Sequence, residues 1–194
     1  MEIWIVSAVV ILGVVAYFAL FLIVEFVLTR SRLGSREQGN KDRMSLFFFF
    51  ICPFFGMVLW MAAVNHKVVH ANPSWPQWIA GVAIGLLGFA VRIIGKRTLG
   101  RFYTVRVQLQ EGHEVVDRGV YGLIRHPLYL GIILEWMAPP LILGSPAGFL
   151  FTTIWMVIGV LQRIPREEAL LVEGLGEKYR AYMGRTKRLI PGVW

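Results

Sequence analysis

Long apolar runs alternate with short polar segments along this chain. Five runs stand out: Ile3 to Leu28, Leu46 to Val64, Trp78 to Ile94, Leu128 to Leu143, and Ala147 to Leu161. An apolar helix of roughly 20 residues crosses the hydrocarbon core of a bilayer while satisfying its own backbone hydrogen bonds. The pattern therefore predicts an all-α integral membrane protein, in which residues 1–194 form a single membrane domain with five transmembrane helices.

The fourth and fifth runs are short, and only Gly144-Ser145-Pro146 separates them. So brief a connection forces two helices to be antiparallel neighbours, which predicts a tight helical hairpin. Pro139 and Pro140 are expected to kink the end of the fourth helix, because proline removes a backbone donor and its ring clashes with the preceding turn.

The Lys and Arg residues between the runs predict the topology. Residues 30–43 hold five, residues 65–77 hold one, residues 92–125 hold seven, the hairpin link holds none, and residues 163–188 hold seven. Basic residues favour the cytoplasmic side. We therefore expect an N-terminus outside, a cytoplasmic C-terminus, and a cytoplasmic cofactor region formed by residues 105–129 and 163–191.

Composition narrows the function classes. The chain is 56% hydrophobic and only 16% charged, which is unlike a soluble domain. Its net charge of +8 lies in loops beside apolar runs and does not predict nucleic-acid binding. Cys52 is the only cysteine, and only His113 and His126 among the four histidines lie on the cytoplasmic side, so no metal site is expected.

Two features inside the runs have competing interpretations. Gly81, Gly85 and Gly88 could suggest a dinucleotide loop, but small residues at this spacing in an apolar run favour a close helix-packing face. Glu135 lies within the fourth run, where a carboxylate is a functional candidate by default. A structural role, in which it pairs with a basic group or a polar atom of another helix, has equal weight.

Two charged segments flank the hairpin. Residues 121–131 place Arg, His and two Tyr before the fourth run, and residues 163–168 follow the fifth. Arg163 and Glu167 project from one helix face, either as an ordinary salt bridge or as a site in which the arginine captures a carboxylate or phosphate. Pro127 predicts a helix start beside His126, where free N–H groups would suit an anion.

Residues 166–185 predict an amphipathic helix on the cytoplasmic side, with Ala169, Leu170, Val172, Leu175, Tyr179 and Tyr182 as its apolar and aromatic members. Gly174 and Gly176 weaken this helix near its middle and are expected to split it in two. Residues 105–121 are too polar to span a membrane and predict a loop near the charged segments.

The order of these motifs resembles the isoprenylcysteine carboxyl methyltransferase family. The motifs are Gln-x4-His-x-Val-Val-x3-Val-Tyr-x3-Arg-His-Pro-x-Tyr-x-Gly, a hairpin, Arg-x3-Glu-Glu-x-x-Leu and Gly-x-x-Tyr-x-x-Tyr. The resemblance covers roughly Gln108 to Pro191 and looks most like a compact prokaryotic member. Its Arg-His-Pro-x-Tyr-x-Gly core is shared with phospholipid methyltransferases.

The resemblance implies a cofactor, S-adenosylmethionine (SAM), and a set of residues that bind it. These residues are Gln108 (with Gln110 as a substitute), His113, Glu114, Val115, Val116, Tyr121, His126, Pro127, Leu128, Tyr129 and Glu167. Arg163 would match the family's arginine for the substrate carboxylate, so that Arg163 and Glu167 form the catalytic pair.

The implied reaction is methyl transfer to the carboxylate of a prenylated cysteine, free or at a protein C-terminus, or of a similar lipidated acid. The alternatives are a phospholipid N-methyltransferase and, from another class, a small membrane transporter. The absence of an internal repeat in the sequence counts against a transporter. The compact form favours a prokaryotic plasma membrane, with the endoplasmic reticulum as the location in a eukaryote.

Overall fold

The computed structural model describes residue 19, residues 74–104 and residues 109–194. The first two predicted spans and Gln108 lie outside the described residues. The elements in order are α3 (Trp75–Leu99), η2 (Gly100–Phe102), η3 (Gly119–Gly122), α4 (Pro127–Ile142), α5 (Pro146–Leu175) and α6 (Glu177–Arg185). No strand occurs within these ranges, and a single parallel bridge joins Ile124 to Lys187. The predicted all-α class is confirmed for this part of the chain.

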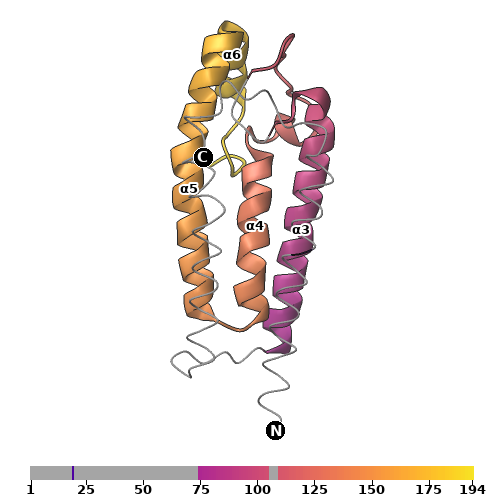
Figure 1. The fold of residues 1–194 in the computed structure, drawn as a ribbon, viewed down its shortest axis with the longest axis vertical. Coiled ribbons are helices and arrows are strands. Elements are labelled where there is room, and N and C mark those ends of the chain that lie inside the picture. Colours follow the sequence, from indigo (N-terminus) through magenta and orange to yellow (C-terminus); the bar gives the residue numbers. More distant parts are fainter. Residues whose placement is uncertain (1–18, 20–73, 105–108) are drawn as a thin grey trace.

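Helices α3, α4 and α5 run along the long axis of the molecule, with α4 between the other two (Figure 1). Both α3, continued by η2, and α5 are long and apolar enough to cross a membrane, whereas α4 is shorter. Large apolar side chains on α5 remain exposed along one stripe: Leu150, Phe151, Ile154, Ile158 and Leu161. Side chains of this kind suit contact with lipid, where they cost nothing to expose.

The α3–α4 interface depends on glycine. A Cβ atom at Gly88 would lie 2.7 Å from the Gly131 carbonyl oxygen, and one at Gly81 would lie 2.6 Å from a side-chain carbon of Ile142. The two backbones therefore approach more closely than any larger residue allows. This confirms the prediction of a helix-packing face and excludes the dinucleotide-loop alternative.

Glu135 contributes to the same interface. It forms a buried ion pair with Arg92 of α3. Of the two interpretations of Glu135, this pair gives the structural one a physical basis, because each charge inside the helix bundle compensates the other. The arginine partner could not be identified from the sequence, because Arg92 lies near the end of its own apolar run.

The hairpin is as tight as the sequence predicts. Helix α4 continues through Pro139 and Pro140 to Ile142, and α5 begins at Pro146. Ser145 caps α5, because its hydroxyl oxygen accepts a hydrogen bond from the Gly148 N–H at 3.1 Å. Gly144 adopts a φ of 65°, a left-handed conformation that glycine tolerates without strain.

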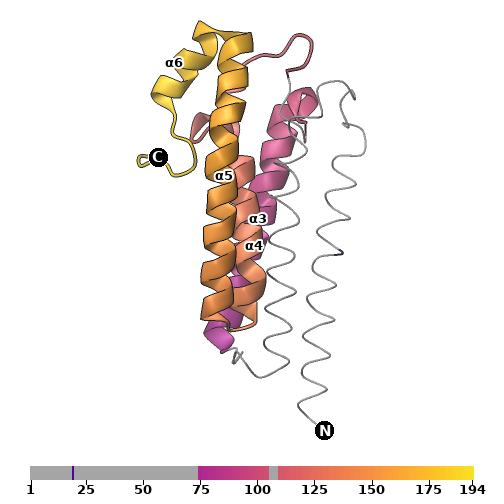
Figure 2. The same cartoon turned by 60° about the vertical axis from the view of Figure 1, so that its left-hand side comes forward.

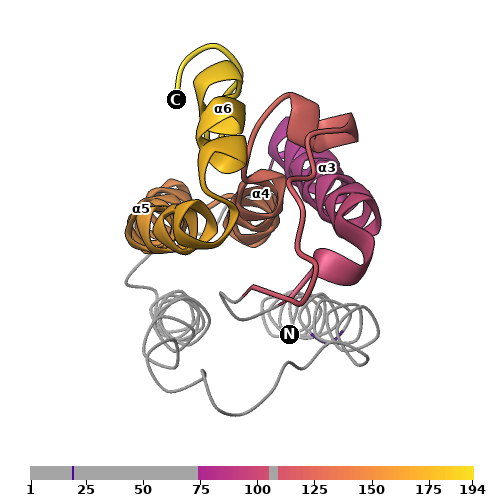
Figure 3. The ribbon, with the colours of Figure 1, turned by 90° about the horizontal axis from the view of Figure 1, so that it is seen from above.

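Helix α5 is longer than the fifth apolar run. It continues past Leu161 and through Pro165 to Leu175, so the predicted helix starting at Arg166 is in fact the end of α5. Helix α5 ends before Gly176, which has a φ of 59°, and α6 then folds back at an angle beside the upper end of α5 (Figures 2 and 3). The predicted split at the glycines is confirmed.

Candidate functional site

Four segments meet at one end of the bundle: the 109–126 connection, the first turns of α4, the last turns of α5, and the chain after α6 (Figures 1 and 3). Proline at the first position of α4 fixes where this helix begins, with His126 as its N-cap residue. The hairpin then returns the chain to the same end. The two charged segments that flank the hairpin are therefore neighbours in space.

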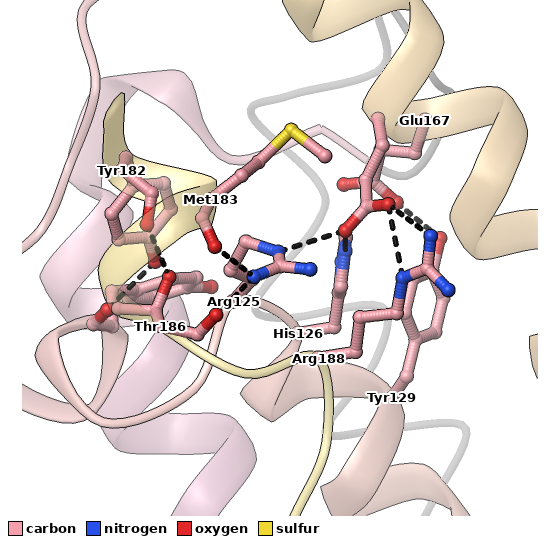
Figure 4. A network of polar contacts seen from close by, with 10 residues as sticks. Arg125, His126, Tyr129, Glu167, Tyr182, Met183, Thr186 and Arg188 are labelled. Atoms are coloured by element: carbon pink, nitrogen blue, oxygen red, sulfur yellow. Dashed lines mark hydrogen bonds and ion pairs between the residues drawn. The ribbon is translucent and has the colours of Figure 1, made fainter. Parts of the chain in front are cut away.

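Arg163, Tyr129 and Glu167 form a chain of hydrogen bonds between α5 and α4 (Figure 4 shows its Tyr129 and Glu167). The Arg163 Nε–H donates to the Tyr129 hydroxyl oxygen at 2.8 Å, and this hydroxyl donates to Glu167 Oε2 at 2.5 Å. Arg163 is buried, whereas Glu167 is half-buried. The hydroxyl of Tyr129 thus links the two charged groups, a contact that the sequence did not indicate.

Glu168 is the centre of a second cluster, which the sequence did not reveal. Its buried carboxylate accepts from Arg125 Nε at 2.8 Å and from Arg188 Nη2 at 2.8 Å, and it lies 3.3 Å from His126 Nε2 (Figure 4). The hydrogen bond from Arg188 to Glu168 raises the pKa of the arginine. Residues 167 and 168 are about 100° apart on a helix, so adjacent glutamates had to face different groups.

Arg125 attaches the end of α6 to this cluster. Its Nη1 donates to the main-chain carbonyl oxygen of Met183 at 3.0 Å and also to that of Thr186. Cationic groups stabilise the carbonyls at a helix C-terminus. Tyr182 adds a hydrogen bond from its hydroxyl to the Tyr121 carbonyl oxygen at 2.7 Å. Helix α6 is therefore held over the site by defined polar contacts.

The 109–122 connection brings further predicted residues towards Glu167. Burial lowers the pKa of His113, with the Glu167 carboxylate acting in the opposite direction. Burial raises the pKa of Tyr121 well above its usual value, and the charge of Glu167 adds to this. The Tyr121 hydroxyl is buried without a hydrogen-bond partner among the described residues. His113 packs its ring against Phe102, with centroids 4.7 Å apart.

The remaining predicted site residues have less direct positions. Glu114 is exposed, Val115 and Val116 are half-buried, and Pro127 is buried. A Cβ atom at Gly95 would lie 2.8 Å from a side-chain carbon of Leu128, which therefore packs towards α3. Gln110 is the substitute for Gln108. Its main-chain carbonyl oxygen accepts a hydrogen bond from the main-chain N–H of His113 at 3.0 Å.

Two of the backbone donors expected for an anion seat at the start of α4 are already bonded within the protein. The His126 N–H donates to the Arg188 carbonyl oxygen at 3.0 Å, and the Tyr129 N–H donates to the His126 carbonyl oxygen at 3.1 Å. Proline has no N–H to offer. The His126 and Tyr129 N–H groups are therefore used by the fold.

Comparison with known proteins gives consistent matches. Residues 81–173 match the model of the isoprenylcysteine carboxyl methyltransferase family. A probable protein-S-isoprenylcysteine O-methyltransferase of Oryza sativa subsp. indica is 27% identical over 121 residues, which is 61% of this chain and 63% of that protein. The corresponding Dictyostelium discoideum enzyme is 30% identical over 125 residues, covering 62% and 52%. The matched part thus spans less than two thirds of these relatives.

Two further similarities extend this picture. A methanethiol S-methyltransferase of Pseudomonas deceptionensis is 36% identical over 75 residues, which is 38% of this chain and 27% of that protein. The solved structure of a eukaryotic intramembrane Ras methyltransferase, an isoprenylcysteine carboxyl methyltransferase, matches the fold with a TM-score of 0.69 at 22% identity. It covers 96% of this chain and 68% of that one. Together these matches confirm that the chain resembles the isoprenylcysteine carboxyl methyltransferase family in sequence and in fold.

Proposed function

We propose that this protein transfers a methyl group from SAM to the carboxylate of a prenylated cysteine or of a similar lipidated acid. The observation that carries the proposal is the Arg163–Tyr129–Glu167 chain, at the end of a helix bundle that matches the family. It sets a buried cation beside a half-buried anion, with one phenol between them. A carboxylate acceptor and a cationic donor need groups of these two signs close together.

Arg163 is the group we assign to the acceptor. A carboxyl group with an ordinary pKa of about 3.5 is ionised at neutral pH, so its methylation needs alignment rather than a strong general base. A guanidinium binds a carboxylate through two parallel N–H groups. Because the Arg163 Nε–H is bonded to Tyr129, the plane of the guanidinium is fixed. Burial excludes water that would otherwise solvate the nucleophile.

Glu167 is the group we assign to the cofactor. The residues present fit SAM, because a half-buried carboxylate suits its ammonium group or ribose hydroxyls. The hydroxyl of Tyr121, which has no hydrogen-bond partner in the part of the chain that the structure describes, can bond a polar ligand. When bound, SAM supplies a methyl group on a positively charged sulfur. The other proposed cofactor contacts are Gln108, His113, Glu114, Val115, Val116, His126, Pro127, Leu128 and Tyr129.

The charge pattern of the loops and the arrangement of the helices support a site at the membrane face. The site lies at the end of apolar helices, where a lipid tail can remain in the bilayer and a soluble cofactor can enter from water. The loop charges favour the cytoplasmic face, with the N-terminus outside, and we propose a prokaryotic plasma membrane. The acceptor is then a lipidated small molecule or the prenylated C-terminus of a protein.

The test is methyl transfer by the purified protein from labelled SAM. We expect label in farnesylated cysteine and none in phosphatidylethanolamine, the acceptor of the phospholipid alternative. Arg163→Ala should abolish transfer and leave SAM binding, measured by calorimetry, within about twofold of the wild type, whereas Glu167→Ala should weaken SAM binding first. Arg166→Ala, which removes an exposed arginine from the same helix, is the matched control. Equal loss of binding and transfer in Arg163→Ala would refute its assigned role.

Tyr129→Phe separates alignment from binding. The substitution keeps the ring and removes the hydroxyl that links Arg163 to Glu167. We expect a fall in kcat of about tenfold or more, since misalignment of bound reactants reduces the rate of the chemical step. Calorimetry should show a much smaller change in SAM affinity, because the aromatic ring that we assign to the cofactor is retained. A loss confined to SAM affinity would mean that the hydroxyl serves the cofactor alone.

A thiol acceptor is the second candidate, because methanethiol S-methyltransferases resemble part of this chain. A small thiol carries no carboxylate, so Arg163 would have no direct partner in it. Methanethiol as the acceptor in the same assay distinguishes the two functions. If Arg163→Lys still methylates methanethiol, the thiol reaction is favoured. If Arg163→Lys no longer methylates farnesylcysteine, methylation of the carboxylate is favoured.

A further inference from the structure

We propose that the chain after α6, residues 186–194, binds the lipid surface of the membrane. In this segment the 189–194 turn presents apolar side chains to the bilayer interface, and Lys187 contacts anionic headgroups. No methyl donor or acceptor takes part in this interaction, so the proposal is independent of the proposed function.

The first observation is the depth at which the turn lies. Leu189 is buried in the core cluster formed by Ile132, Ile133 and Trp136 of α4 with Met156, Val160 and Ile164 of α5. In Figure 2 the segment descends from α6 and ends beside the upper part of α5. Nearby on α5, Ile158 and Leu161 expose 43% and 45% of their surface. The turn therefore lies at the level where the helix surface is already apolar.

The second observation is what the turn exposes. The Leu189 and Ile190 N–H groups both donate to the main-chain oxygen of Trp194, at 2.9 Å each, which closes the turn on itself. Ile190 is left 52% exposed and Val193 71% exposed. The Val193 and Trp194 N–H groups donate to the Ile190 carbonyl oxygen, at 3.1 and 3.3 Å, and these bonds lower the cost of bringing the backbone of the turn to an apolar interface. Two large apolar side chains are then aimed outward.

The third observation is the polar boundary of the turn. The Arg188 guanidinium lies over the Trp194 ring, 5.2 Å from its centroid, while also pairing with Glu168. Tryptophan and long basic side chains are typical of the level of lipid headgroups. Residues 178–194 contain five Lys or Arg and no Asp or Glu.

Charge complementarity identifies the occupant as an anionic lipid surface. Arg180, Arg185 and Arg188 form ion pairs with Glu177, Asp117 and Glu168, respectively. Lys187 is exposed and pairs with no carboxylate among the described residues, and it directly precedes Arg188 and the turn. Basic residues beside an inserted apolar segment attract anionic headgroups. An aqueous protein partner would not favour a turn at this depth.

The Ile124–Lys187 bridge and the bond from the His126 N–H to the Arg188 carbonyl oxygen, at 3.0 Å, fix the segment to the start of α4. The position of the turn in the bilayer is thereby joined to the polar cluster around Glu168. The segment sets how deep this end of the bundle lies in the interface.

The experiment attaches a nitroxide spin label to Val193→Cys in a Cys52→Ala background, with the whole chain in lipid nanodiscs. We expect several-fold more collisions with oxygen, relative to a water-soluble nickel complex, than for a label at Lys178 at the start of α6. A label at residue 190 gives a second reading if the first variant folds poorly. Equal access to the nickel complex at residues 193 and 178 would overturn the proposal.

Two further measurements distinguish anionic lipid from a second copy of the chain as the binding partner of the turn. In nanodiscs of phosphatidylcholine with phosphatidylglycerol, Lys187→Gln should move the label at residue 193 towards water, whereas Lys178→Gln, the matched control, should not. An unchanged label in Lys187→Gln would overturn the headgroup contact. Dipolar broadening that disappears on dilution with unlabelled protein would instead assign the turn to an interface with a second copy of the chain.

Discussion

Replacing Glu168 with glutamine tests whether its cluster holds this end of the molecule together. The substitution keeps the shape of the side chain but removes the charge that faces Arg125, Arg188 and His126. Breaking a buried ion pair by removing one partner costs about 3–5 kcal/mol. We expect the lower end, about 3 kcal/mol, because Arg188 is 29% exposed and can regain water, and Arg125 keeps its carbonyl contacts.

The assay is thermal unfolding in detergent, followed by tryptophan fluorescence. For a chain of this length, about 1 kcal/mol corresponds to about 2–4 °C in Tm, so Glu168→Gln should lower Tm by about 6 °C or more. Glu167→Gln is the matched control on the neighbouring residue. It is half-buried and bonded by a neutral phenol, so it should cost no more than about 1 kcal/mol. Equal Tm values for the two variants would refute the inference that Glu168 stabilises this end of the molecule more than Glu167 does.

Three further predictions concern packing, pH and surface charge. Gly88→Ala should destabilise the protein by about 1–3 kcal/mol, because its Cβ would meet a backbone carbonyl of α4, whereas Gly184→Ala, in open space, should not lower Tm. Burial lowers the pKa of His113 below its value in the unfolded chain. The contribution of the neutral histidine to stability should therefore be complete above about pH 6.5 and be lost as the pH falls further. The Tm of His113→Phe should change less over this pH range than the Tm of the wild type. Asp117→Asn breaks an ion pair with Arg185 whose side chains are both largely exposed, and should change Tm by no more than about 4 °C.

The sequence allowed much of the local geometry of the candidate site to be predicted, because its residues lie in short local motifs. Pro127 marks the start of a helix, the hairpin link is too short for any other arrangement, and the spacing of Arg163 and Glu167 puts them on one face. The interposed Tyr129 could not be foreseen. Its position depends on how α4 and α5 are rotated about their axes, which side-chain packing between the helices decides.

The sequence by itself determined the fold class, the apolar helices and the ends that carry polar chemistry, because apolar periodicity, proline and glycine act locally along the chain. Only the tertiary structure decided that Glu168 gathers Arg125, His126 and Arg188, and that Leu189 returns to the core of α4 and α5. The residues in these contacts lie at least 20 positions apart in the sequence, and Arg125 and Glu168 lie 43 positions apart. Local propensity does not encode these contacts. The ion pairs form only when helix packing brings each buried charge to a partner that compensates it, and the same packing creates the apolar surface that Leu189 contacts.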